Sequence, residues 1–402
     1  MSPRIYGLLL SRFLSALGDQ LLLFAVPLIV YRSTGSIRMS GLAFFIEWLP
    51  RVLSLPIAGQ ISDRFGGKRL YIGADALRAL ACLTVALWVA DQHQVPIMAV
   101  MLMMGGCAFA YAQAFIALET SLPQLVSPAQ MPTAQSALQA IDQTSAIAGP
   151  AAASLLMLWL TPEQLLWLTG SAFALSAIGA QCFCPALARP DAKIKRPALW
   201  HHWRASGAKV LGHPVLRALV ILSVSVNLIA GLALASGAAI TLGRFGLDPR
   251  HFGSLQGSVG ILAVCVLLAV PILLRWLSVY RLGIASYTAI ALGGLLMASA
   301  ANYPLFVLGY AICFAACGSF NVFIRSERLL WIAEAERGSL ISLIVLFNQL
   351  SLPLAGLLIS LADTRHGPQW LFYPASLLAC LLILALHPGL HRQAGTARVM
   401  AE

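Results

Sequence analysis

The chain carries twelve apolar stretches of roughly 20 residues, the length that an α-helix needs to cross the hydrocarbon core of a bilayer. Hydrophobic residues make up 59% of its 402 residues and charged residues only 10%, whereas a soluble domain carries roughly 25% charged residues. We therefore expect an all-α membrane protein with twelve transmembrane helices. The stretches begin near Ile5, Ser40, Leu70, Val95, Ser136, Gln164, Val215, His251, Leu282, Tyr303, Ser339 and Gln369.

Most of the 26 Lys and Arg residues fall in loops on the side of the two termini, if every apolar stretch crosses the membrane once. Cytoplasmic loops are enriched in Lys and Arg. The distribution predicts a multi-pass membrane protein with both termini in the cytoplasm. The net charge of +11 then reflects orientation in the membrane, and we expect no nucleic-acid partner. The first apolar stretch contains Arg12 and Asp19 and is too long for a cleavable signal, so we expect it to remain as a span.

One long polar segment separates six stretches from six. It predicts a six-helix bundle at 1–186, a cytoplasmic linker at 187–214, a second six-helix bundle at 215–388 and a cytoplasmic tail at 389–402. The end of the linker, from Trp200 to His213, reads as a short amphipathic helix that stops before Pro214. We expect it to rest on the inner leaflet as a connection rather than to regulate the protein.

Between the second and third stretches lies a short basic hairpin with glycines at its turn. It contains Gly59, Asp63, Arg64, Gly66, Lys68 and Arg69, in the order Gly-x-x-x-Asp-Arg-x-Gly-x-Lys-Arg. This order resembles the loop between helices two and three of the major facilitator superfamily. The resemblance implies two pseudo-symmetric six-helix bundles around a central site, and a loop that takes part in conformational switching. Asp75 and Arg78 follow about two turns later, and we expect them to join the charge network of this loop.

Other segments resemble one branch of that family, the enterobactin-exporter-like and macrolide-efflux-like proteins. They are Gly18-Asp19-Gln20, Phe24 to Pro27, Asp75-x-x-Arg78 and His213-Pro214-x-x-Arg217. The pair Gly149-Pro150 is similar to the antiporter motif of the family, although Ala151 to Ser154 replace its later glycines. The resemblance implies secondary export of a small molecule across the bacterial inner membrane, and this molecule is either a siderophore or an amphiphilic drug-like compound. The fourth stretch lacks the arginine that drug antiporters often carry there, which puts their usual proton relay in doubt.

Charged residues inside membrane spans are costly and normally face a cavity or a partner. Asp19, Glu47 and Asp142 are therefore candidates for proton coupling. Asp19 and Asp142 are favoured because neither has a basic residue one turn away on its own helix. Glu47 is four residues before Arg51 and can pair with it directly. A protonated carboxylate would bias the equilibrium between inward-facing and outward-facing states.

Candidates for substrate binding are the remaining polar residues deep in the spans. Arg12 would suit an anionic solute, or it would extend its head group to the inner membrane boundary. The full set is Arg12, Arg51, Gln139, Asn227, Gln256, Asn321 and Asn348.

Several classes of function are disfavoured by motifs that the sequence lacks. It has no phosphate-binding glycine loop followed by Lys and Ser or Thr, and Cys182-x-Cys184 lacks the spacing of a zinc site. We expect no cofactor, no metal and no enzymatic activity, and partners limited to lipid, a small-molecule substrate and protons around a monomer. A proton-coupled importer of a small anionic metabolite remains the alternative, and an intramembrane enzyme or scaffold a weaker one.

Overall fold

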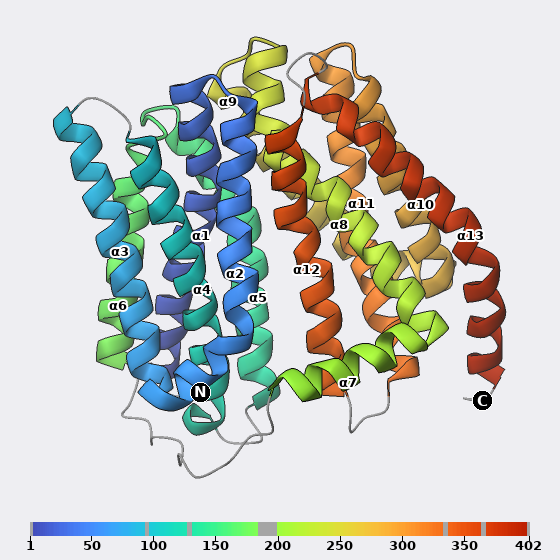
Figure 1. The fold of residues 1–402 in the computed structure, drawn as a ribbon. Coiled ribbons are helices and arrows are strands. Elements are labelled where there is room, and N and C mark those ends of the chain that lie inside the picture. Colours follow the sequence, from blue (N-terminus) through green and yellow to red (C-terminus); the bar gives the residue numbers. More distant parts are fainter. Residues whose placement is uncertain are drawn as a thin grey trace. The chain divides into compact units, whose positions relative to one another are not determined.

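The protein is helical throughout the part that the computed structural model describes, which comprises residues 3–92, 96–126, 131–183, 199–332, 337–362 and 367–399. Thirteen α-helices occupy these ranges, and twelve of them begin within a few residues of the predicted starts (Figure 1). The additional helix is α7. Their bounds are α1 Pro3–Thr34, α2 Ile37–Phe65, α3 Gly67–Gln92, α4 Ile97–Leu125, α5 Met131–Leu156, α6 Leu165–Phe183, α7 Leu199–Gly212, α8 Pro214–Ala239, α9 Pro249–Leu273, α10 Val279–Ser299, α11 Tyr303–Trp331, α12 Arg337–Leu361 and α13 Phe372–Val399, with a π-helical turn at Ile240–Arg244 and a 3-10 turn at Pro368–Leu371.

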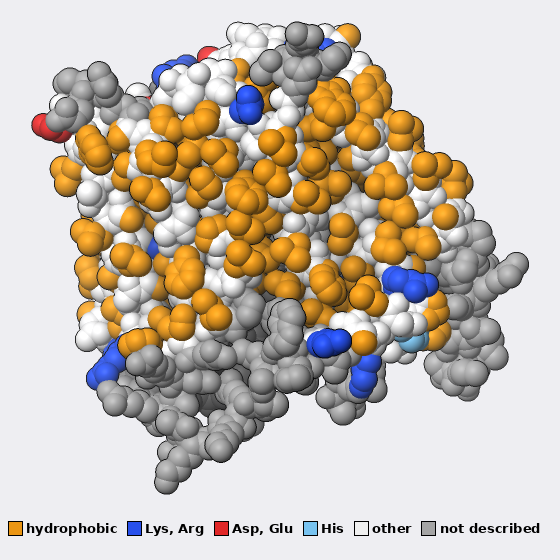
Figure 2. All heavy atoms as spheres, viewed as in Figure 1, with side chains coloured by type: hydrophobic (Ala, Val, Ile, Leu, Met, Phe, Trp, Pro, Cys, Tyr) orange, Lys and Arg blue, Asp and Glu red, His pale blue; other side chains and the backbone are white. Residues whose placement is uncertain are grey.

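Ten helices in the described ranges are long and apolar enough to cross a membrane. The two other long helices, α2 and α5, carry polar residues near their middle: Glu47 and Arg51 in α2, and Asp142 in α5. Figure 2 shows a face covered mainly by hydrophobic side chains, on which most of the visible charges lie near the helix ends. Exposed leucines such as Leu80 and Leu268 belong to this apolar surface. A surface of this kind suits lipid rather than water.

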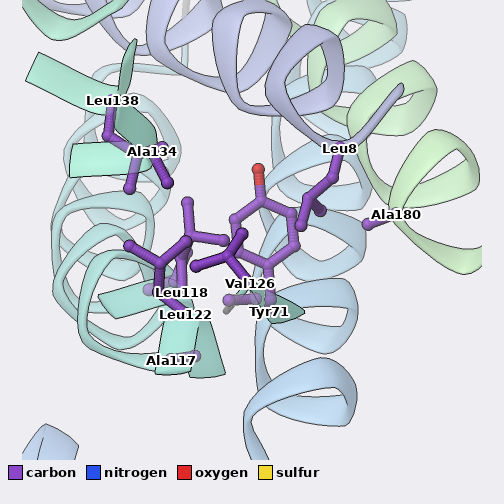
Figure 3. Packing of buried hydrophobic residues seen from close by; sticks show 12 residues of the cluster. Leu8, Tyr71, Ala117, Leu118, Leu122, Val126, Ala134, Leu138 and Ala180 are labelled. Carbon is purple, nitrogen blue, oxygen red and sulfur yellow. The ribbon is translucent and has the colours of Figure 1, made fainter. Parts of the chain in front are cut away.

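The chain divides into two compact units, and the first comprises Met1–Lys195 together with Asp248–Gly257 at the start of α9. Within it, α1 packs against α2, α5 and α6, and α3 packs between α4 and α6. A cluster of buried apolar residues lies among these helices, as Figure 3 shows. The ring of Tyr71 lies within the cluster, and its hydroxyl points away from Leu122 and Ala117.

The predicted reversal between the second and third helices is confirmed at Gly66. This residue ends α2 with φ 82° and donates its N–H to the carbonyl of Ser62 at 2.8 Å. Residues with a side chain rarely adopt this backbone conformation, so glycine is required there. The next residue, Gly67, begins α3 so close to α4 that a Cβ atom would overlap Ser121. Lys68 donates to the carbonyl of Gln181 at 3.2 Å, whereas the side chains at 59, 63 and 64 lie outside the described part.

The second unit comprises Arg196–Leu247 and Ser258–Glu402. In it, α8 packs against α12 and α13, and α10 packs against α11 with Gly293 and Gly309 in mutual contact. Helix α7, Leu199–Gly212, lies where the amphipathic helix is expected. Its fully buried Val210 joins a cluster formed with side chains of α8, α11 and α12, so this face of α7 contacts protein rather than the leaflet.

Candidate functional site: buried charges in the first unit

Asp19 lies at the centre of a network of buried charges that joins several helices of the first unit. Nη2 of Arg51 on α2 lies 3.1 Å from both carboxylate oxygens of Asp19, and Nη2 of Arg78 on α3 donates to Oδ1 at 2.8 Å. The side chains of all three residues are at most 7% exposed. Since a buried charge is tolerated only with partners, these contacts explain how α1 carries a carboxylate into the bundle.

The same network continues from Arg78 to Asp75, one turn earlier on α3. Nη1 of Arg78 lies 3.0 Å from Oδ1 of Asp75, which also accepts from Ser15 of α1 at 3.2 Å. The other carboxylate oxygen accepts from Ser176 of α6 at 2.7 Å. These contacts lie inside the bundle, and Asp75 is eight residues, or roughly 12 Å, along α3 from Gly67. The predicted association of Asp75 and Arg78 with the basic hairpin stays a prediction, because the side chains at 63 and 64 lie outside the described part.

Aromatic rings cover the guanidinium groups of this network. The guanidinium carbon of Arg51 lies 3.9 Å from the ring centroid of Tyr111, and that of Arg78 lies 3.7 Å from the centroid of Phe173. Arg12 also approaches Tyr111, at 5.9 Å. Stacking of this kind stabilises a cation where water is excluded and fixes the orientation of its plane.

Arg12 forms a separate ion pair with Asp142. Its Nη2 lies 2.7 Å from Oδ1 of Asp142, so the pair joins α1 to α5. Arg12 is 2% exposed and its charge is paired inside the bundle, which disfavours the alternative that its head group extends to the membrane boundary. Asp142 is 31% exposed, so the Arg12–Asp142 pair is more accessible than the ion pairs around Asp19.

Glu47 differs from the other carboxylates of the first unit. It is 1% exposed, and within the described residues its Oε1 atom has no hydrogen-bond partner. The pairing predicted between Glu47 and Arg51 is not formed in this part of the chain, because Arg51 binds Asp19 instead. Among the described residues, the three buried arginines Arg12, Arg51 and Arg78 are thus matched by three aspartates, and Glu47 is a further buried acid.

Asp19 and Asp142 have no basic neighbour on their own helices, as the sequence indicates, but each finds an arginine on another helix. Their role in proton coupling stays a prediction.

The antiporter-like pair lies where α5 approaches α1. A Cβ atom on Gly149 would overlap the side chain of Gln20, the neighbour of Asp19. Pro150 is inside α5 and has no N–H for the carbonyl of residue 146, which weakens the helix locally. The pair therefore combines a close helix contact with a weak point in the helix that carries Asp142.

The other substrate-binding candidates are distributed over both units. In the second unit, Asn227 of α8 donates to the backbone carbonyl of Asn348 on α12 at 3.2 Å. Asn321 is exposed on α11, Gln256 is half-buried at the start of α9, and the side chain of Gln139 lies outside the described part. Sequence reasoning missed Glu327, which is only 5% exposed on α11. Helix α11 continues to Trp331, and recognising this length in the sequence would have placed Glu327 inside the helix.

Long apolar helices in two units, with paired charges in the interior of one, define a multi-span membrane transporter. Residues 8–326 match the family model described as Major Facilitator Superfamily, and the chain belongs to this family. Its apolar outer surface is of the kind that suits lipid.

Relatives within the family include efflux pumps. Over 176 residues, 42% of each chain, the protein is 27% identical to the multidrug efflux pump Tap of Mycobacterium tuberculosis. Over 177 residues it is 25% identical to macrolide efflux protein A of Streptococcus pyogenes, covering 44% of this chain and 42% of the relative. The matched segments thus span less than half the length of these curated relatives. The resemblance to enterobactin exporters stays a prediction.

Solved structures of similar fold cover nearly the whole chain. The nucleoside transporter NupG has a TM-score of 0.75 at 14% identity and covers 96% of this chain and 99% of its own. A bacterial homologue of the iron transporter ferroportin has a TM-score of 0.72 at 20% identity, with the same coverage. At these identities the likeness supports the fold alone.

Proposed function

We propose that this protein exports an amphiphilic, drug-like molecule across the bacterial inner membrane by alternating access, in exchange for protons. It would act as a monomer with both termini in the cytoplasm. The observation that carries the proposal of export is the sequence similarity to two efflux proteins, one named for multiple drugs and one for macrolides.

The contacts of the arginines favour an amphiphile over an anionic siderophore or metabolite. Arg51 is held by Asp19, and Arg12 by Asp142. A guanidinium that is already paired offers little net attraction to an anionic substrate, because binding would first have to break a buried ion pair. Tyr111 and Phe115 stack 6.2 Å apart beside Arg12, and both are partly exposed, so the same region offers aromatic surface to an apolar ligand.

The proton would be carried by Glu47. An ionised carboxylate that is buried without a partner costs several kcal/mol, whereas its protonated form is neutral. Proton binding at Glu47 would therefore leave the buried arginines and acids with balanced charge. Proton loss would leave one excess negative charge, which favours whichever conformation gives Glu47 access to water. Asp19 and Asp142 are secondary candidates, since each is held by at least one arginine.

Transport into inside-out membrane vesicles tests export directly. Vesicles that contain the protein should accumulate radiolabelled erythromycin when the lumen is acidic, because protons leaving the lumen drive the drug in. A protonophore should abolish the accumulation, and vesicles without the protein provide the background. Accumulation only in right-side-out vesicles would show import, and accumulation that ignores the pH gradient would exclude proton exchange.

A further inference from the structure

Helices α8 and α12 of the second unit pack against each other (Figure 1). Asn227 on α8 donates to the carbonyl of Asn348 on α12, and one turn further Gly231 lies against Leu352 and Ala355. The close approach at Gly231 leaves no room for a side chain. This close packing fixes how α8 and α12 are aligned along their axes, so that Asn227 lies opposite Asn348.

Two buried polar atoms, one on each of these helices, have no partner among the described residues. Oδ1 of Asn348 is buried without a hydrogen bond, and so is Oγ of Ser223, whose residue is 4% exposed. Ser223 lies four residues before Asn227 on α8, so the two occupy the same face of the helix. Polar groups removed from water are normally paired, and each exception calls for an explanation.

The hydroxyl of Ser223 is unusual when compared with the other serines of α8. Ser225 donates to the carbonyl of Leu222 at 2.8 Å, and Ser236 donates to the carbonyl of Leu232 at 2.6 Å. Both satisfy themselves within the helix, as buried serines commonly do. The described structure gives Ser223 no such bond.

A proline adds another acceptor at the same level of α12. Pro353 is inside the helix and has no N–H to donate to the carbonyl of Gln349, which directly follows Asn348. The Oδ1 atom of Asn348 and this carbonyl can only accept hydrogen bonds, and Ser223 can accept one as well. A ligand that satisfies them must supply O–H or N–H donors.

We propose that Ser223, Asn348 and the carbonyl of Gln349 form a substrate-binding site in the second unit that recognises hydroxyl or amine donors of the exported molecule. This inference rests on the proposed function for its choice of substrate. The site selects, among amphiphilic molecules, those that carry hydrogen-bond donors. The buried charges of the first unit are not part of it.

Equilibrium binding to the purified full-length protein in detergent tests this site separately from transport. The two probes are erythromycin, which carries several hydroxyl groups, and tetraphenylphosphonium, an amphiphilic cation without hydrogen-bond donors. Ser223→Ala and Asn348→Leu should each weaken erythromycin binding about fivefold to tenfold. Their affinity for tetraphenylphosphonium should equal that of the wild type.

Two control variants distinguish a loss of specific contacts with erythromycin from damage to the fold. Ser236→Ala removes a buried hydroxyl of the same helix that is bonded internally, and it should leave erythromycin binding unchanged. Ser223→Thr keeps a hydroxyl and should bind erythromycin nearly as the wild type does. The proposal is overturned if erythromycin does not bind, if the Ser223 and Asn348 variants bind it as the wild type does, or if they lose both probes equally. Failure of vesicle transport with these binding differences intact would instead count against the proposed export.

Discussion

Arg51 binds Asp19 on the neighbouring helix α1 and not Glu47, which lies one turn before it on its own helix. This choice divides the acids of the first unit into two kinds. Asp19 accepts from two arginines and holds α1, α2 and α3 together, whereas Oε1 of Glu47 stays without a partner in the described structure. We propose that the first kind stabilises the bundle and that the second gains and loses the transported proton.

A double-mutant cycle should detect this division. We expect Asp19→Asn and Arg51→Gln to show a coupling energy of about 1–3 kcal/mol in the free energy of unfolding, because they remove the same contact. Glu47→Gln and Arg51→Gln should show a smaller coupling. Denaturant titration of the protein in mixed micelles gives both values. A larger coupling for Glu47 would mean that the pairing along α2 exists after all.

The single variants of Asp19 and Glu47 should also differ in stability, with the larger loss at Asp19. Asp19→Asn leaves Arg51 and Arg78 with less negative charge in a buried site, so we expect a loss of about 3–5 kcal/mol. Glu47→Gln removes an acid that has no ion pair, and it should change stability by less than about 1 kcal/mol. Thermal unfolding in detergent, followed by circular dichroism, compares the two. Equal losses would place Glu47 in the structural network.

The reversal at Gly66 should tolerate no side chain. Gly66→Ala is expected to cost about 1–3 kcal/mol, because φ 82° is strained for any other residue. Since the hairpin is proposed to act in conformational switching, transport should slow while the range of substrates stays the same. Gly73→Ala on α3 is the matched control, because a Cβ atom there meets open space. Normal turnover in Gly66→Ala would remove the hairpin from the mechanism.

The contact at Gly149 offers a second test of close packing. A methyl group at this position would overlap Gln20, so Gly149→Ala should destabilise the protein by about 1–3 kcal/mol and separate α5 from α1. Gly106→Ala on α4 has room for its methyl group and should be neutral or slightly stabilising. The two melting temperatures in detergent provide the comparison. If Gly149→Ala melts like the wild type, α5 can shift away from α1 without loss.

Hydropathy and turn residues were enough to place the helices. The predicted starts at Tyr303 and Val215 lie at or beside the observed starts of α11 and α8, because a polar break between apolar stretches has a clear local signal. Twelve spans are predicted, whereas ten helices in the described ranges are apolar enough to cross a membrane by themselves. Helix α2 carries Glu47 and Arg51 buried among other helices, so its mean hydropathy understates how well it fits there.

The charged residues could be named from the sequence, but their partners could not. A spacing of four residues predicts that Glu47 can meet Arg51, yet it says nothing about competition from another helix. Arg51 binds Asp19 because α1 packs against α2. This packing is a tertiary contact, and no pattern in the neighbouring sequence indicates it. The pairing of Arg12 with Asp142, which are far apart in sequence, is of the same kind.

The central claim is that Glu47 carries the proton. A comparison of transport against a concentration gradient with exchange at equal concentrations tests this claim most directly. Proteoliposomes that contain Glu47→Gln should fail to concentrate erythromycin on an imposed pH gradient. They should still exchange labelled for unlabelled drug, since a permanently neutral side chain permits the conformational change. The matched control is the double variant Arg12→Gln with Asp142→Asn, which removes an acid together with its partner and should keep uphill transport. If Glu47→Gln concentrates the drug as the wild type does, Glu47 does not carry the proton.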